Sequence, residues 1–496
     1  MTNISKLASK FKDYVSPALL AVILAAIISG ILFFINPIHG LADNGDFYRA
    51  MLGNGIYRLP HPSNQYLSYV IPKFGIMKYL NENNVAVFSS QSLFIQLALV
   101  LNRLFYSRTI FDIRFLGVVY YVFYLGGIYL LTKSLVYPYK KVRSYVVALL
   151  VVVMFADSSF TLYFNSFFAE PGMLIVMLYA FGALMAIAHK CYQKNWPMVL
   201  LFFVSSIILI TNKQQNAPLA LSFMVITIGL FFLPQVRARK LLLGLGMLGI
   251  LIAGGVTYAL INTEFSTVNQ YQAFTHGVLM ETGDPSHKIA KGGISQQFAL
   301  MRADDYYPKT YAAVKPSGKL VTKKLTKRVG LAWVVRYYAS NLRQFGQLLD
   351  VAAKDVMVTQ VKAVGDYTKS SGAKPGTQVT YFTAFSAYMG AFFPGKFAFL
   401  CLLAIAFIAV YGVSFYLDLK SGKITGIIRF FLVLGLMTMV IFVPIISIIG
   451  DGDADLAKHL FMVPLSLDLV IIQFIADILH HRLWQSSTES RDWNEK

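Results

Sequence analysis

Charged residues are scarce in this sequence, and acidic residues are the scarcest. Only 14% of its 496 residues are Asp, Glu, Lys or Arg, and 24 acidic side chains stand against 44 basic ones. An average soluble domain contains roughly 25% charged residues. Together with a hydrophobic content of 56%, this excludes an ordinary soluble domain and is typical of a polytopic membrane protein.

Cysteine is nearly absent as well. Cys191 and Cys401 lie at the end of one apolar segment and inside another, so they form neither a disulfide framework nor a metal-binding spacing. The net charge of +20 could indicate a nucleic-acid-binding protein. However, the Lys and Arg residues recur in short loops between apolar runs, as membrane topology requires. We therefore expect a lipid bilayer as a partner and no nucleic acid.

Long apolar runs are what the sequence has in abundance. A membrane-spanning helix needs about 20 apolar residues to cross roughly 30 Å of hydrocarbon. Ten candidate runs lie at 17–35, 115–136, 144–158, 171–189, 198–211, 217–233, 240–261, 396–417, 424–449 and 456–479. The sequence thus predicts an all-α polytopic membrane protein with about ten transmembrane helices. The run at 17–35 is longer than the apolar core of a cleaved signal peptide, so we interpret it as a retained first span.

Basic residues predict how the spans are oriented. They collect in alternate loops, at Lys6, Lys10, Lys12, Lys140, Lys141, Arg143, Lys190, Lys194, Arg237, Arg239, Lys240, Lys420, Lys423 and Arg482. The short loops on the other side hold Lys213 and Lys458. The positive-inside rule then places both termini in the cytoplasm and the sparse loops outside. Polar residues interrupt 88–105, which we interpret as an interfacial amphipathic helix rather than a span.

Two long extracytoplasmic segments follow from this topology. The membrane core of seven spans covers 1–261 and includes the first outer loop at 36–114; three further spans and a cytoplasmic tail cover 396–496. Between them lies an extracytoplasmic region at 262–395. Apolar residues at helical spacing predict a helix near 332–357, and 315–327 and 367–377 look flexible or turn-rich.

The first outer loop begins with an unusual polar stretch from Leu41 to Arg49. It places Asp43, Asp46 and Arg49 where a spanning helix should end. A carboxylate is costly in or near hydrocarbon, so it must face water, a partner or a substrate. The stretch predicts either a catalytic aspartate at the mouth of a membrane cavity or a helix that simply stops, with solvated acids.

A second outer loop, 163–171, ends in Glu170 and Pro171 and lacks Lys and Arg. Proline suits the first turn of a helix, and a glutamate there meets the positive end of the helix dipole. Glu170 could therefore be a simple helix-terminal acid. Asn165 and Ser166 nearby favour a larger polar site.

The loop at 211–218 brings Lys213 to the outer side against the topological trend, beside Gln214 and Asn216. A lysine ammonium suits phosphate as a point charge, although a lysine at a helix end also reaches the interface without any ligand.

The last outer loop, 450–459, contains Asp451, Asp453 and Asp455, then Lys458 and His459. It lacks the downstream bidentate Glu of a calcium loop. Cations about one turn inside a span usually face a cavity or a partner rather than lipid. Four outer loops therefore each bring acid, amide or base to one membrane face.

In these four loops the chain resembles the GT-C glycosyltransferase superfamily, and more narrowly the bacterial glycan-biosynthesis hexose transferases of the Wsf type. The resemblance rests on the Asp motif at 44–49, the Glu-Pro ending at 165–171, and the segments 213–218 and 451–459. It covers most of the membrane portion and is loose in 285–380.

This resemblance implies a bacterial plasma-membrane enzyme with an extracytoplasmic site. The enzyme would move a hexose from a polyprenyl-phosphate donor to a cell-envelope glycan such as teichoic acid, with inversion. Asp46 would be the general base that activates the acceptor hydroxyl, and Glu170 would hold substrate hydroxyls or a metal. The donor phosphate would bind Lys213, Arg49, Lys458 and His459. The remaining candidates for substrate binding are Asp43, Asn44, Asn165, Gln214, Asn216, Asp451 and Asp455.

Several alternatives stay open. A flippase or transporter of lipid-linked saccharides would place its ionisable residues near the middle of the spans, whereas here they cluster at the outer ends. A polymerase or ligase of lipid-linked glycans would share the topology and the acidic loops. No cofactor is indicated, and no ligand spacing decides whether a divalent metal takes part.

Overall fold

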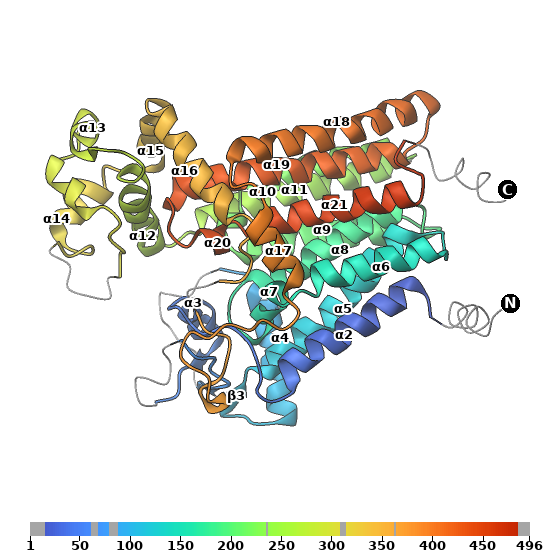
Figure 1. Ribbon diagram of the computed structural model, residues 1–496, viewed down its shortest axis with the longest axis horizontal. Coiled ribbons are helices and arrows are strands. Elements are labelled where there is room, and N and C mark those ends of the chain that lie inside the picture. Colours follow the sequence, from blue (N-terminus) through green and yellow to red (C-terminus); the bar gives the residue numbers. More distant parts are fainter. Residues whose placement is uncertain are drawn as a thin grey trace.

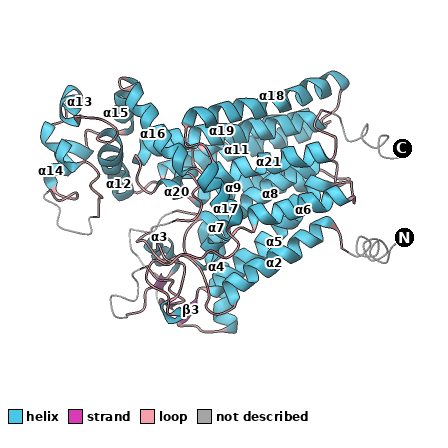
Figure 2. Ribbon diagram, viewed as in Figure 1, coloured by secondary structure: helices cyan, strands magenta, loops and turns pink. Residues whose placement is uncertain are grey.

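The computed structural model describes residues 15–60, 68–78, 88–234, 237–307, 314–361 and 364–484. Within them, seven helices are long and apolar enough to cross a membrane. They are α2 (Pro17–Phe34), α5 (Arg114–Val136), α8 (Glu170–Ala188), α11 (Arg237–Ala259), α18 (Phe397–Ser421), α19 (Thr425–Asp451) and α21 (Met462–Leu479). The chain is thus a mostly helical multi-pass membrane protein, as predicted, and its helices run side by side in one bundle (Figures 1 and 2).

The predicted count of about ten spans is not confirmed. An eighth span arises if α6 (Val142–Phe155) is joined to the turn at Ser158–Asn165 across a bend of 52°. The runs predicted at 198–211 and 217–233 form the shorter helices α9 (Trp196–Asn212) and α10 (Leu219–Ile228), the latter continued by a 3₁₀ turn at Gly229–Phe232. The run at 456–479 is broken after α20 (Leu456–His459), so α21 begins only at Met462.

Burial separates central helices from outer ones. In α8, 94% of the apolar stretch is buried inside the protein, whereas in α11 and α18 only 22% is. Because lipid tails are as apolar as leucine, a helix on the lipid side keeps its side chains exposed to the bilayer. Helix α8 is therefore the centre of the bundle, and α11 and α18 lie at its periphery.

One end of the bundle gathers the loops that the sequence assigns to the cytoplasm. The Tyr145 hydroxyl donates to the Val15 carbonyl (2.7 Å), and Arg143 donates to the Leu479 carbonyl (2.8 Å). Thr425, at the start of α19, donates to the Ala188 carbonyl at the end of α8 (2.9 Å). The basic N-terminal residues 1–14 and the tail beyond 484 lie outside the described residues.

The opposite end carries the loop at 36–114, which contains a small sheet that the sequence did not predict. Its three antiparallel strands are β1 (Ile56–Tyr57), β2 (Lys73–Ile76) and β3 (Ile110–Asp112), in the order β1-β2-β3. Two short helical turns, α3 (Phe47–Met51) and η1 (Leu52–Asn54), precede it.

Helix α4 (Gln91–Phe105) occupies the segment predicted to be amphipathic, but polar and apolar residues lie on both of its faces. Its polar Gln91 and Asn102 are buried, while Leu104 and Phe105 are exposed. Gln91 donates to the carbonyls of Phe167 and Phe168 (both 2.8 Å). The outward face of α4 carries exposed leucines and Phe105 together with Gln96 and Arg103, a mixture that suits the boundary between lipid and water.

The region 262–395 is mostly short helices and extends beyond this end of the bundle (Figure 1). In order they are α12 (Thr263–Ala273), η6 (Phe274–Val278), α13 (Pro285–Lys291), η7 (Gln296–Met301), α14 (Lys319–Val321), η8 (Thr322–Thr326), α15 (Leu331–Ala339), α16 (Leu342–Asp355), η9 (Lys369–Ser371) and α17 (Ala384–Phe392).

Two predictions for this region need correction. The helix predicted at 332–357 is divided between α15 and α16, with the break at Ser340 and Asn341. The segment 315–327 contains helical turns at 319–326 rather than turns and coil alone. By contrast, 367–377 is turn-rich as predicted, with left-handed glycines at Gly372 and Gly376 (φ 77° and 78°). The division into 1–261, 262–395 and 396–496 stays a prediction.

Candidate active site

Asp46 lies in a tight turn that its neighbours shape. The Asp43 carboxylate accepts hydrogen bonds from the backbone N–H groups of Gly45 (2.7 Å) and Phe47 (3.2 Å) and pairs with Arg58. The Asn44 side chain accepts from the Asp46 N–H (3.2 Å). Asp and Asn favour such local side-chain turns. Asp43 and Asn44 thus position Asp46, and their predicted role in substrate binding stays a prediction.

The Asp46 carboxylate forms the centre of an ion-pair cluster. Its Oδ2 lies 2.6 Å from Lys458 Nζ, and its Oδ1 lies 3.3 Å from a terminal nitrogen of Arg49. Lys458 also pairs with Asp455 (3.0 Å). The Lys458 side chain is 4% exposed and that of Asp46 is 30% exposed, so water and ligands reach the carboxylate more easily than the ammonium. The loops at 36–114 and 450–459 meet here.

Electrostatics keep this pair ionised. Burial alone would raise the pKa of the Asp46 carboxyl, but the charges of Lys458 and Arg49 and the hydrogen bond from Lys458 lower it below its usual range. Burial likewise opposes the charge of Lys458, yet Asp46 and Asp455 raise the pKa of its ammonium. A nearby opposite charge favours the charged form of both partners.

Glu170 and Lys213 form a second pair at the same end of the bundle, with Nζ 3.0 Å from Oε1. The Glu170 side chain is 1% exposed. Glu170 is the first residue of α8, followed by Pro171, as its sequence predicts. Lys213 lowers the pKa of Asp46 through its charge, so the two ion pairs lie within one electrostatic environment.

A glutamine that the sequence did not single out connects the two pairs. Gln215 lies in η4 (Gln214–Asn216) and donates to the carbonyls of Lys458 (3.5 Å) and His459 (3.3 Å). The amide run Gln-Gln-Asn was the available signal in the sequence, but the prediction named only Gln214 and Asn216 from it.

His459 contributes a neutral ring rather than a cation. Its Nε2 lies 3.5 Å from the Asp451 carboxylate. Burial, followed by the charges of Lys213 and Lys458, lowers the pKa of the imidazole to about 3. At neutral pH the ring can therefore donate or accept a hydrogen bond but adds no positive charge.

Aromatic rings border the cluster. The Arg49 guanidinium lies 4.3 Å from the centre of the Phe265 ring, and Lys458 Nζ lies 5.6 Å from that of Phe168. Cations over aromatic faces gain electrostatic stabilisation. Phe265 belongs to α12, so the region 262–395, called the extramembrane region below, contributes to the site. No pattern in the sequence indicated this contact.

The loop that carries Lys458 is held by the extramembrane region. The Asp453 N–H donates to the His276 carbonyl (2.9 Å), and the His276 ring lies 2.9 Å from Asp453 and 3.2 Å from Asp305. Gly452 has φ 67°, and a Cβ there would lie 2.4 Å from the His276 carbonyl oxygen. This close approach therefore requires glycine.

Three amide residues predicted for the site, Asn165, Gln214 and Asn216, have no described side-chain contact with the ion pairs. Asn165 donates to the His39 carbonyl (2.7 Å) and Asn216 to the Leu209 carbonyl (3.0 Å), so both join backbone segments. The Gln214 side-chain nitrogen is buried without a hydrogen-bond partner. Their roles in substrate binding stay predictions.

The part of the chain that the structure describes contains no group of three or more His, Cys, Asp or Glu side chains placed to hold a metal ion. A cavity of about 310 Å³ lies against the Asp46 turn, lined by Gly45, Tyr48, Met51, Leu52 and Arg58. Chemically, the site offers an ionised carboxylate beside two cations and a second carboxylate–ammonium pair. It can bind an anion and accept a proton once that anion has engaged the cations.

Comparison with known proteins gives one family. No curated protein matches the chain in sequence. Among solved structures, the apo form of the Archaeoglobus fulgidus oligosaccharyltransferase matches with a TM-score of 0.36 and 14% identity, covering 92% of this chain and 50% of that one. The chain thus spans half the length of that enzyme. The family described as YfdI N-terminal transmembrane domain matches residues 2–495, so the chain belongs to this family of transmembrane proteins.

Proposed function

We propose that the protein is a GT-C-type glycosyltransferase that moves a hexose from a polyprenyl-phosphate donor to a cell-envelope glycan. The observation that carries the proposal is the joining of Asp46–Lys458–Arg49 with Glu170–Lys213 at one end of an apolar bundle. A lipid-linked donor keeps its chain in the bilayer and its phosphate at the end of the spans, at the level of these cations.

The donor phosphate would compete with Asp46 for its partners. Lys458 and Arg49 are bound to a carboxylate in the free protein, and a phosphate oxyanion is an equally suitable ligand for both. As the phosphate engages these cations, the pKa of Asp46 rises toward its usual range. Asp46 then becomes a better base only when the donor is present, so donor binding and activation of the base are coupled.

The chemical step is a single displacement. The acceptor hydroxyl oxygen attacks the anomeric carbon, its proton passes to the Asp46 carboxylate, and the bond from carbon to phosphate oxygen breaks with its electron pair leaving on the phosphate. Lys458, Arg49 and Lys213 stabilise that charge as it develops. Attack opposite the leaving phosphate inverts the anomeric configuration, and Glu170 would hold sugar hydroxyls.

The proposed setting is the bacterial plasma membrane, with the site outside and both termini inside. Basic loops at the end opposite the site support this orientation through the positive-inside rule. The region 262–395 would help to bind the acceptor, since Phe265 contacts Arg49 and His276 contacts the Lys458 loop.

The test is transfer activity of Asp46→Asn in membranes supplied with polyprenyl-phosphate hexose and cell-wall acceptors. Loss of a general base typically costs about 10²- to 10⁴-fold in rate, so we expect transfer to fall in that range with donor binding retained. The matched control is Asp284→Asn at the start of α13, where Asn still caps the helix. Full activity of Asp46→Asn would refute the role of Asp46.

The same assay separates the alternatives. Products that carry one hexose per acceptor support a transferase, whereas products that grow by whole saccharide units indicate a polymerase or ligase. If the wild type transfers nothing but moves sugar-lipid across vesicles, the protein is a flippase and the proposal fails.

A further inference from the structure

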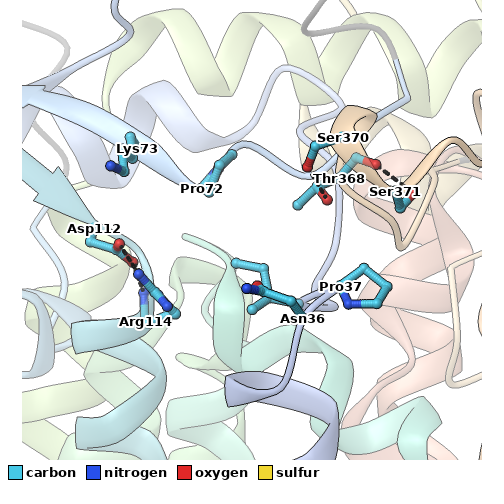
Figure 3. Close-up of a pocket in the computed structure, with 10 residues that line it drawn as sticks. Asn36, Pro37, Pro72, Lys73, Asp112, Arg114, Thr368, Ser370 and Ser371 are labelled. Atoms are coloured by element: carbon cyan, nitrogen blue, oxygen red, sulfur yellow. Dashed lines mark hydrogen bonds and ion pairs between the residues drawn. The ribbon is translucent and has the colours of Figure 1, made fainter.

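A second, larger pocket lies on the far side of the small sheet from Asp46. Its volume is about 570 Å³. It is bounded by the end of α2, the start of α5, strands β2 and β3, and the segment that contains η9 (Figure 3). The lining residues are Asn36, Pro37, Ile38, Pro72, Lys73, Asp112, Arg114, Thr368, Ser370 and Ser371. Neither the sequence analysis nor the proposed function uses this pocket.

Backbone hydrogen bonds hold its walls together. The Val70 N–H donates to the Tyr367 carbonyl (2.9 Å), and the Ile113 N–H donates to the Pro72 carbonyl (2.9 Å). The Ala42 N–H donates to the carbonyl of Gly365 (2.8 Å). Three segments that lie far apart in the sequence are thus joined, so the pocket is preformed.

An aromatic layer separates the pocket from the Asp46 site. Successive side chains of a strand point to opposite faces, so Lys73 lines the pocket while Phe74 points away and is fully buried. Phe74 packs against Phe167 (5.0 Å between ring centres), which also packs against Phe47 (5.6 Å). Phe47 follows Asp46 directly, so the two sites lie on opposite sides of this layer.

The lining is rich in hydrogen-bond donors and carries a net positive charge. Asp112 accepts two hydrogen bonds from Arg114 (2.9 and 2.7 Å), so their charges compensate each other. These two hydrogen bonds use two of the five N–H donors of the Arg114 guanidinium. Lys73 adds an ammonium whose described contact is the ring of Tyr106, at 5.4 Å. The pocket therefore favours an oxyanion.

Hydroxyl groups face these cations across the pocket. Figure 3 shows Lys73 and Arg114 on one side and Thr368, Ser370 and Ser371 on the other. The Thr368 and Ser370 hydroxyls lie 3.1 Å apart. A ligand that fills this space must therefore offer an anionic group at one end and hydroxyl or ester oxygens at the other.

The depth of the pocket identifies the source of such a ligand. Asn36 lies two residues beyond α2, and Arg114 is the first residue of α5. Both helices are membrane spans, so the pocket lies at the boundary between hydrocarbon and water, where the phosphates of the bilayer are found.

We propose that this pocket binds the phosphodiester headgroup of an anionic phospholipid. The phosphate would engage Lys73 and the free N–H groups of Arg114, and the glycerol hydroxyls would bond to Thr368 and Ser370. The site is independent of glycosyl transfer, and its occupant is a resident lipid rather than a substrate.

The test is lipid binding to the purified full-length protein, measured by native mass spectrometry. The probes are phosphatidylglycerol and phosphatidylcholine with the same acyl chains, and inorganic phosphate. One cation near a membrane phosphate contributes about 1 kcal/mol, so Lys73→Gln should weaken phosphatidylglycerol binding about fivefold. Lys374→Gln, an exposed lysine outside the pocket, is the matched control and should bind as the wild type does.

Three results would overturn the proposal. They are unchanged phosphatidylglycerol binding by Lys73→Gln, equal binding of phosphatidylcholine by the wild type, and binding of inorganic phosphate at this site without retention of lipid. If Lys73→Gln fails to fold, Ser370→Ala removes an exposed hydroxyl of the pocket and should also weaken phosphatidylglycerol binding; an unchanged affinity there refutes the proposal as well.

Discussion

The proposed role of Asp46 and its surroundings make opposing demands on the pKa of its carboxyl. A general base must take up a proton, but the charges of Lys458 and Arg49 hold the pKa of its carboxyl below the usual range. In the free protein the Asp46 carboxylate is therefore a weak base. Because those same cations are the natural ligands of a donor phosphate, substrate binding and activation of the base are one event in the proposed mechanism.

Replacing Lys458 with methionine tests this coupling. Without the ammonium, the carboxylate of Asp46 loses its closest stabilising charge, so the pKa of Asp46 rises. We expect transfer to slow and the acidic limb of the pH–rate profile to move to higher pH, measured over the range in which the protein stays folded. Lys374→Met serves as the control. An acidic limb that does not move would contradict the coupling.

The Glu170–Lys213 pair allows a separate test of stability. Lys213→Met leaves a carboxylate that is 1% exposed without its cation. Breaking a buried pair costs about 3–5 kcal/mol; because Lys213 is 24% exposed, we expect about 1–3 kcal/mol, visible as a lower unfolding temperature in detergent. The double variant Glu170→Gln with Lys213→Met should recover stability but not transfer. A double variant no more stable than Lys213→Met would refute the pairing.

At this scale the sequence indicated the ionisable residues but not their pairs. Asp46, Glu170, Lys213 and Lys458 stand out because charge is rare among apolar runs. Their pairing depends on which loops meet, and Asp46 and Lys458 are 412 residues apart. Phe265 could not be predicted, because an aromatic residue on a helix is normally a packing residue.

Among the elements, the turn between α19 and α20 is held by contacts with the region 262–395. It contains Gly452 and Asp453, which contact η6 through His276, and it leads directly to Lys458. Through the contacts of His276 with Asp453, the region 262–395 therefore supports the loop that leads to Lys458, the residue that pairs with Asp46.

This contact predicts a pH dependence. The hydrogen bond to Asp453 raises the pKa of His276 above its ordinary 6.5, against the effect of burial. A raised folded-state pKa means that the stabilisation is fully present below pH 6.5 and is lost as the pH rises through the higher folded value. We expect the wild type to lose thermal stability over this window relative to His276→Gln. Parallel curves for the two proteins would contradict the prediction.

How well sequence patterns predicted an element depended on the length of that element. The long apolar helices were predicted because a run of about twenty apolar residues is typical of a membrane-spanning helix. The strands were missed because they are two to four residues long, as in Lys73–Ile76, and their pairing is a tertiary property. The broken helix at Asn341 shows the same limit, since apolar periodicity continues across the break.

For the whole molecule, the two ends of the bundle have opposite characters. One end joins the predicted cytoplasmic loops through contacts such as Arg143 with Leu479, and the other joins the acidic loops around Asp46 and Lys458. The sequence predicted this division from loop charges alone. The family match and the structure establish a membrane protein, while the orientation stays a prediction.

Cysteine labelling tests the orientation. With Cys191 and Cys401 replaced by serine, single cysteines are introduced at Lys194 and at Lys374, both exposed and at opposite ends of the bundle. A membrane-impermeant maleimide added to intact cells should label Lys374→Cys and not Lys194→Cys, and permeabilised cells should label both. The reverse pattern would invert the topology and place the Asp46 site in the cytoplasm.

The ion pair between Asp46 and Lys458 also has a consequence for biosynthesis. A ribosome makes Asp46 first and Lys458 only 412 residues later. Until the loop with Lys458 has been translated and inserted, the carboxylate has no lysine partner, and the proposed phosphate site lacks its most buried cation. A nascent chain that ends before this loop would therefore sit in the membrane with the proposed donor site unfinished, and we expect no transfer from it.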